Sequence, residues 1–324
     1  MAKRTNDLRR TGVRLSADQR QNIIVGIAAI LIYAFFGYES RYFLKWKNIV
    51  AILVAAAPLG LVTIAECSLL TCGEWDMSCG NVSSVAGIVW GLLVIGGMNV
   101  WLALALAVCV GVVSGTVVGL LVAYCNVTAW MASYSILMIL QTFIYVLTDG
   151  LAIPMSQYKD FKVLGQFKVF GTSITLPIVI MIVLFLAMYY VLKYTKFGRD
   201  MFVVGGNREA AVNAGINVPK IKIVSFILSG ALSALAGCMF VSRSGAVQPF
   251  VGGLWAMQAI ASSIVGGASL GGGKANLAMA FVGVLIMVGL QNGLNMINVS
   301  PFYQYMVTGV SLSIAVLMQA ERRK

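Results

Sequence analysis

The chain has 324 residues, of which 60% are hydrophobic and only 10% are charged. Soluble domains carry about 25% charged residues, so this composition excludes a soluble globular protein and indicates a helical membrane protein. The sequence contains no histidine, which excludes Ser-His-Asp and Cys-His nucleophiles and His-ligated zinc or haem. We expect no catalytic residue and no metal or cofactor site in this chain.

Apolar runs predict an all-α protein with about ten membrane-spanning helices. The first run, residues 22–38, follows a basic segment but lacks the small-x-small cleavage site of a signal peptide, so we interpret it as an uncleaved helix. Further spans are expected at 49–70, 82–98, 99–124, 128–148, 176–192, 222–242, 255–267, 275–297 and 303–319. The expected domains are a basic N-terminal segment (1–21), a transmembrane domain (22–319) with an internal polar loop at 193–221, and a C-terminal tail (320–324).

The net charge of +12 is concentrated in few segments. Six basic residues precede the first span, six lie between residues 193 and 222, Lys274 stands alone, and three end the chain. The positive-inside rule then places both termini and the polar loop in the cytoplasm. Because topology explains the charge, we do not expect nucleic acid as a partner.

A polar hairpin, Leu70 to Ser84, interrupts the apolar sequence. Ionisable groups at membrane depth normally face a cavity or a partner, so the hairpin is a candidate gate or lining of a translocation pathway. An interfacial turn whose acids meet water is the alternative. The candidate residues are Glu66, Glu74, Asp76 and Ser78. The nearby Cys67, Cys72 and Cys79 are expected to be buried thiols, and a disulfide among them is possible but not indicated.

The segment from Asp149 to Thr175 is the longest one expected outside the membrane. It is either a solvated connector or a docking surface for a partner on that side.

The most specific pattern lies in the internal loop, at residues 205–216. Asn207 is suited to cap a short helix that carries Glu209 in its first turn, near the positive end of the helix dipole. The alanines at 210, 211 and 214 then form a small-residue face for a partner protein, and Gly215 ends the helix in a left-handed conformation. Such a helix between two spans acts as a lever. The candidate coupling residues are Gly205, Gly206, Asn207, Arg208, Glu209, Ala210, Ala211, Ala214 and Gly215.

Residues 267–273 echo residues 73–80 with one gap, which suggests an internal repeat of the kind that many transporters contain. The end of this string, Gly273-Lys274, looks like a P-loop. However, Ala268 replaces the first glycine of that motif, and Ala275 stands where Ser or Thr should hold magnesium. We therefore expect ATP and Mg²⁺ to be bound by a partner subunit.

A polar stripe is expected on one late helix, because its members are spaced three and four residues apart. These amides can bond either the hydroxyls of a passing sugar or a neighbouring helix. The stripe comprises Gln291, Asn292, Asn295 and Asn298.

The string Glu209-Ala210-Ala211-x-x-x-Gly215 resembles the coupling-helix motif of bacterial ATP-binding-cassette (ABC) importer permeases. The longer run over residues 205–216 resembles specifically the ribose, xylose and galactoside permease family. The resemblance continues at 226–232, 266–273, 292–295 and 300–302, and upstream at 73–80. The sequence departs from the family in its first hairpin at Cys72, Glu74 and Trp75, as well as at Cys67 and Cys79.

The resemblance implies the membrane subunit of an ATP-driven sugar importer in the bacterial inner membrane. Such a subunit is not itself an enzyme. It works with a second permease, identical or different, with cytosolic ATPase subunits, and with an extracytoplasmic sugar-binding protein. Two alternatives stay open: an ion-coupled transporter that uses Glu66, Glu74 and Asp76, and an ABC permease for nucleosides or a furanose signal molecule.

Overall fold

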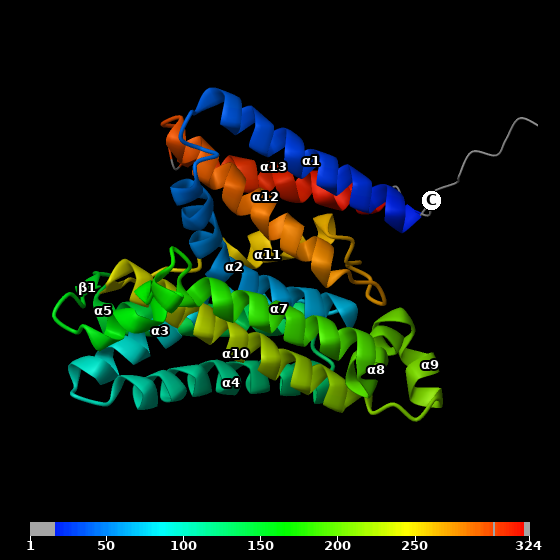
Figure 1. Ribbon diagram of the computed structural model, residues 1–324. Coiled ribbons are helices and arrows are strands. Elements are labelled where there is room, and N and C mark those ends of the chain that lie inside the picture. The colour runs from blue at the N-terminus through cyan, green and yellow to red at the C-terminus, as the bar shows by residue number, and fades with distance from the viewer. Residues whose placement is uncertain (1–16, 301, 321–324) are drawn as a thin grey trace, which may run out of the picture.

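The computed structural model describes residues 17–300 and 302–320. The chain is mostly helical over these ranges (Figure 1), which confirms the all-α class. Most of the expected basic N-terminal segment and of the C-terminal tail lies outside the described residues.

Ten helices fall on the ten expected ranges. They are α1 (Ala17–Glu39), α2 (Trp46–Thr71), α3 (Cys79–Ile95), α4 (Val100–Tyr124), α5 (Ala129–Thr148), α7 (Leu176–Tyr194), α10 (Val218–Ser244), α11 (Trp255–Val265), α12 (Leu277–Met296) and α13 (Phe302–Ala320). The connections contain β1 (Ile153–Pro154), η1 (Asp160–Lys162), α6 (Val163–Gln166), η2 (Val169–Gly171), α8 (Lys196–Gly206), α9 (Arg208–Asn213) and β2 (Ala246–Val247).

Seven of the described helices are long and apolar enough to cross a membrane: α1 (from Gln19), α2, α4, α5, α7, α10 and α12. The chain is thus a multi-pass membrane protein. The apolar helices α3 and α11 have only 17 and 11 residues, whereas a full crossing needs about 20. Irregular, glycine-containing backbone precedes α3 and follows α11, so each is shorter than its apolar run. Ten full-length spans are therefore not confirmed.

Helix α10 is central to the packing of the helices, because it contacts α2, α3 and α4. Glycines on α4 allow this helix to approach α10 closely. A Cβ at Gly111 would overlap the carbonyl oxygen of Gly230, and a Cβ at Gly115 would overlap that of Phe226. Small residues four apart permit such backbone contact in membranes, where helix association depends on van der Waals packing.

The helices form two groups in Figure 1, with α1, α12 and α13 above the group that contains α3, α4, α5, α7 and α10. Helix α2 joins them, since it contacts α11 and α12 as well as α7 and α10. The beginning of α1, the end of α13 and the short helices α8 and α9 all lie at the same end of the molecule, and β1 lies at the other (Figure 1). The basic internal loop therefore shares one end with both ends of the described chain, as the charge distribution predicts.

The segment from Asp149 to Thr175 is folded against the end of α10. Its strand β1 pairs antiparallel with β2. The Ser242 hydroxyl donates to the carbonyl of Phe161 at 2.6 Å and accepts the Gly165 N–H at 2.7 Å. The segment is thus an ordered cap on this end of the helices, and its role as a docking surface stays a prediction.

The six cysteines, all within the described ranges, are free thiols. Cys67, Cys72 and Cys79 are buried as expected, and no disulfide joins them. Cys109 and Cys125 are exposed instead, because they lie on the outward face of α4 and in the turn after it.

Candidate functional site

The short helix α9 forms where the sequence predicts it. The Asn207 side chain accepts the N–H of Ala210 at 3.0 Å and caps the first turn. Glu209 lies in that turn, and Gly215 follows the helix with a φ of +74°. Cap, acid and glycine together delimit a six-residue helix between α8 and α10. Both ends of α9 are therefore determined by residues close to them in the sequence.

The alanines at 210, 211 and 214 do not form one exposed face, which corrects our expectation. Ala211 is buried in the main core, whereas Ala210 and Ala214 are exposed. The reason is the direction in which α9 docks, because the side of the helix at Ala211 faces the core while the neighbouring positions 209, 210, 212 and 213 are exposed. The outward side of α9 carries Val212 instead, with 58% of its surface exposed. An exposed valine on a short surface helix is suited to contact a partner.

The preceding helix, α8, brings three glycine-containing backbone segments together. We define residues 71–73, 205–206 and 271–273 as the glycine junction. The Gly273 N–H donates to the carbonyl of Thr71 at 3.0 Å. A Cβ at Gly205 would overlap the same carbonyl, and one at Gly272 would overlap the carbonyl of Gly205. The end of α8 thus meets the hairpin before α3 and the loop after α11 in close backbone-to-backbone contacts.

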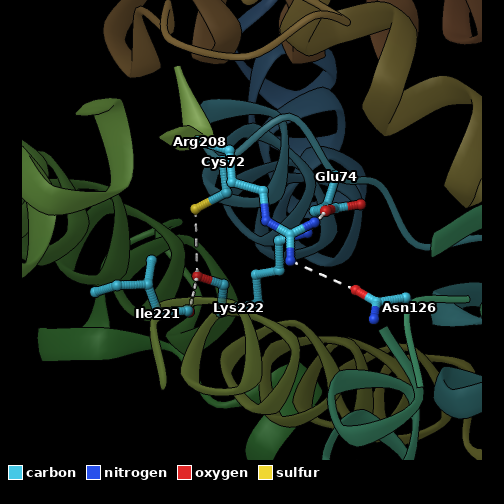
Figure 2. A network of polar contacts seen from close by, with 7 residues as sticks. Cys72, Glu74, Asn126, Arg208, Ile221 and Lys222 are labelled. Atoms are coloured by element: carbon cyan, nitrogen blue, oxygen red, sulfur yellow. Dashed lines mark hydrogen bonds and ion pairs between the residues drawn. The ribbon is translucent and has the colours of Figure 1, made fainter. Parts of the chain in front are cut away.

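A polar network lies beside this junction and joins α9 to its surroundings (Figure 2). Lys222, in the first turns of α10, forms an ion pair with Glu74 in the hairpin. Arg208, the first residue of α9, donates to the amide oxygen of Asn126 at 3.4 Å, and Figure 2 shows its guanidinium between Glu74 and Asn126. These residues line a cavity of about 350 Å³. Side chains therefore connect α9 to the turn between α4 and α5, and the start of α10 to the hairpin.

The acidic residues nearest the membrane interior are buried within the chain. Asp76 accepts hydrogen bonds from the Ser78 N–H at 2.8 Å, from the Ser78 hydroxyl at 2.6 Å and from the Ser229 hydroxyl at 3.0 Å. Glu66 Oε2 accepts the Asp76 N–H at 3.3 Å, while its Oε1 accepts no hydrogen bond from the described residues. Asp76 and Ser78 thus fix the hairpin against α10. A role for these residues and Glu66 in the pathway stays a prediction.

The late polar stripe is only partly on α12. The helix ends at Met296, and Asn298 follows with a φ of +58°, so this residue cannot lie on the same helical face. The amide oxygen of Asn292 accepts a hydrogen bond from the Asn48 side chain at 2.9 Å. This bond joins α12 to α2. Gln291 and Asn295 are on the helix, half-buried and exposed respectively. A role for Gln291, Asn292 and Asn295 in the pathway stays a prediction.

The fold and the site together define a class of protein. The chain is a multi-pass helical membrane protein whose short surface helix is linked, through α8 and a polar network, to irregular segments next to two shortened helices. Short apolar helices next to irregular, glycine-containing backbone are features that membrane transport proteins use around their pathways.

Comparison with known proteins gives the family. Residues 48–316 match the family described as branched-chain amino acid transport system, permease component, and the chain belongs to this permease family. No solved structure matches the chain.

The chain is similar to several curated sugar permeases. It is 32% identical to the ribose import permease protein RbsC of Escherichia coli (strain K12) over 298 residues, which cover 92% of this chain and 93% of that protein. It is 33% identical to the ribose import permease protein RbsC of Haemophilus influenzae, over 90% of each chain. It is 31% identical to the L-arabinose ABC transporter permease protein AraH of Azospirillum brasilense, over 91% of this chain and 86% of that one. The resemblance to ABC permeases is thereby confirmed.

Proposed function

We propose that this chain is the membrane subunit of an ATP-driven importer, and that it conducts a monosaccharide across the bacterial inner membrane. The relatives named above support a sugar, because they are ribose and arabinose permeases matched over nearly their whole length. The observation that carries the proposal is the glycine junction, which connects the helix expected to meet an ATPase with two breaks in the membrane domain.

The orientation follows from charge. The end of the molecule that carries α8 and α9 also carries Lys193, Lys196, Arg199 and Arg208, and the positive-inside rule assigns such an end to the cytoplasm. Both termini then lie in the cytoplasm. The chain crosses ten times if α3 and α11 act as half-helices completed by the adjacent irregular backbone, an arrangement that transporters use around their pathways.

The mechanism has two linked steps. An ATPase that binds the exposed side of α9 moves α9 and α8 as it closes on ATP. Because Gly205 contacts the segments at 71–73 and 271–273, that movement displaces the hairpin before α3 and the loop after α11 together. The pathway alternates between its two open states when the second permease subunit, identical or related, makes the same movement. ATP and Mg²⁺ are bound by the ATPase, so this chain is not itself an enzyme.

The substrate arrives on the opposite side, from an extracytoplasmic binding protein. That protein supplies the affinity, so the pathway needs only weak polar contacts, for which Gln291 and Asn295 on α12 are suited. Nucleosides, a furanose signal molecule and, given the family description, a branched-chain amino acid are the competing substrate classes within the same mechanism.

The test is the ATPase rate of the chain co-purified with its ATPase, in the presence of a binding protein loaded with each substrate class in turn. We expect a loaded pentose to stimulate hydrolysis and Glu209→Arg to abolish the stimulation, because the substitution places a cation in the first turn of α9. Lys220→Glu is the matched control, since Lys220 is an exposed charge at the same end of the molecule but outside α9. Equal stimulation in wild type and Glu209→Arg would remove the coupling role of α9, and stimulation only by a nucleoside or an amino acid would replace the sugar.

The ion-coupled alternative has less support. It needs Glu66, Glu74 and Asp76 to be accessible to an ion, but Glu66 and Asp76 are buried and Glu74 is paired with Lys222. It also gives no role to α9.

A further inference from the structure

A second cavity, of about 570 Å³, lies at the same end of the molecule as α9 but on other elements. Its walls come from the first turns of α1, the end of α7, α8, and the irregular loop between α11 and α12. Gly273 of the glycine junction lines it as well. The coupling mechanism proposed above assigns no role to this cavity.

The cavity is strongly cationic. Lys193, Arg199 and Lys274 line it and are exposed, and none of the described residues that line it is acidic. Two of these cations are held in place. Lys193 Nζ donates to the Tyr189 hydroxyl at 3.0 Å, and Arg199 Nη1 donates to the Tyr194 carbonyl at 3.3 Å. The three cations come from three different elements, so their convergence is a property of the fold and not of one charged run.

The start of α12 adds to this positive potential. Asn276 and Leu277 line the cavity at the first residues of a 20-residue helix, whose N-terminus carries a partial positive charge and free N–H groups. The Asn276 side chain caps the Met279 N–H at 3.2 Å and leaves the N–H groups before it uncapped by that side chain. Together with the three cations, this arrangement is suited to a phosphate group.

The cavity lies between two helices whose outer faces are apolar and exposed. On α7 these include Leu186 and Tyr190, and on α1 they include Ile24 and Ile27. In a membrane such faces meet acyl chains. A ligand that brings a phosphate to the cavity and acyl chains to these faces satisfies both surfaces at once, and a phospholipid has that composition.

We propose that this cavity binds the headgroup of an anionic phospholipid, with the phosphate among Lys193, Arg199 and Lys274. The leaflet rests on the orientation proposed above and is the cytoplasmic one, where anionic lipids attract basic residues. The bound headgroup links α1, the end of α7, α8 and the loop at 266–276, and so steadies one side of the glycine junction. Anionic lipid thereby influences how firmly α8 is held.

The test uses the purified chain in detergent, without ATPase or binding protein, so its outcome is independent of the importer proposal. Native mass spectrometry measures how much phosphatidylglycerol and phosphatidylcholine the chain retains at equal concentrations. The site variant is Lys193→Gln, Arg199→Gln and Lys274→Gln combined. The matched control combines Lys168→Gln, Lys196→Gln and Lys220→Gln, three exposed cations outside the cavity.

We expect the wild type to prefer phosphatidylglycerol and the site variant to bind it roughly 100-fold more weakly, because each of the three basic residues contributes about 1 kcal/mol near an anionic surface. The control should keep the preference. Equal retention of both lipids by the wild type, or an unchanged preference in the site variant, would overturn the proposal.

Competition with inorganic phosphate tests whether the phosphate group bound in the cavity belongs to a lipid headgroup or to a free anion. In the wild type, millimolar phosphate should leave the bound phosphatidylglycerol in place, because the acyl chains contribute to its affinity. If phosphate displaces the lipid completely, the cavity is a site for a free anion instead. This measurement needs no variant, so it holds even if the site variant fails to fold.

Discussion

Replacing Gly205 by alanine tests the glycine junction at its tightest point. The added Cβ would overlap the Thr71 carbonyl oxygen and would lie 2.7 Å from the Gly273 nitrogen and 2.9 Å from the Thr71 carbonyl carbon. All three are backbone atoms, so no side-chain rotation relieves the contact, and α8 or its neighbours must shift. Gly206→Ala is the matched control, because a Cβ there meets nothing within 4 Å.

The expected magnitude follows from three contributions. Overpacking costs about 1–3 kcal/mol, and displacing the Gly273 N–H from the Thr71 carbonyl costs about 1 kcal/mol. Alanine returns up to about 1 kcal/mol relative to glycine in a helix. The net destabilisation of the closed junction is therefore about 1–3 kcal/mol, which shifts an equilibrium between closed and open junctions by about 5- to 150-fold.

Two assays follow this shift. Thermal unfolding of the purified chain, monitored by tryptophan fluorescence, should show a lower Tm for Gly205→Ala and an unchanged or slightly higher Tm for Gly206→Ala. Hydrolysis by the assembled complex should lose much of its substrate stimulation in Gly205→Ala only. If the two variants behave alike in both assays, the junction is not a tight contact and our reasoning about coupling is refuted.

Three further sets of substitutions test other contacts. Asn207→Ala removes the cap of α9 at a cost of about 1 kcal/mol and should speed hydrogen exchange of the α9 amides, whereas unchanged exchange would contradict the cap. Glu74→Gln and Lys222→Met should each cost about 1–3 kcal/mol singly and less than their sum when combined; strictly additive losses in chemical unfolding would show that the pair does not interact. Gly115→Ala should lower the Tm by forcing α4 away from α10, while Gly26→Ala, which meets nothing within 4 Å, should not, and equal Tm values would contradict the close helix contact.

Local signals in the sequence predict much of this fold. Apolar runs locate the helices, because each needs only its own composition to be recognised. Asn207 and Gly215 define α9 correctly, because capping depends on residues within one turn. The sequence also contains Gly111-x-x-x-Gly115, a small-residue spacing from which the contact of α4 with another helix could have been expected.

The remaining features depend on contacts between distant segments. Nothing near Gly205 indicates that it meets Thr71 and Gly273, and the burial of Ala211 depends on the direction in which α9 docks. The similarity between residues 73–80 and 267–273 pointed to two related segments. It did not show that parts of both meet at the end of α8. The helix α8 was missed because its apolar residues are spread within a charged segment.

The central claim is that a separate ATPase drives transport by acting on α9. The most direct measurement is uptake of labelled ribose and arabinose into proteoliposomes that contain the complex, with ATP on the α9 side and the loaded binding protein on the other. We predict uptake that requires ATP, survives collapse of all ion gradients and is lost in Glu209→Arg. Uptake driven by an ion gradient without ATP, and unaffected by Glu209→Arg, would contradict the claim.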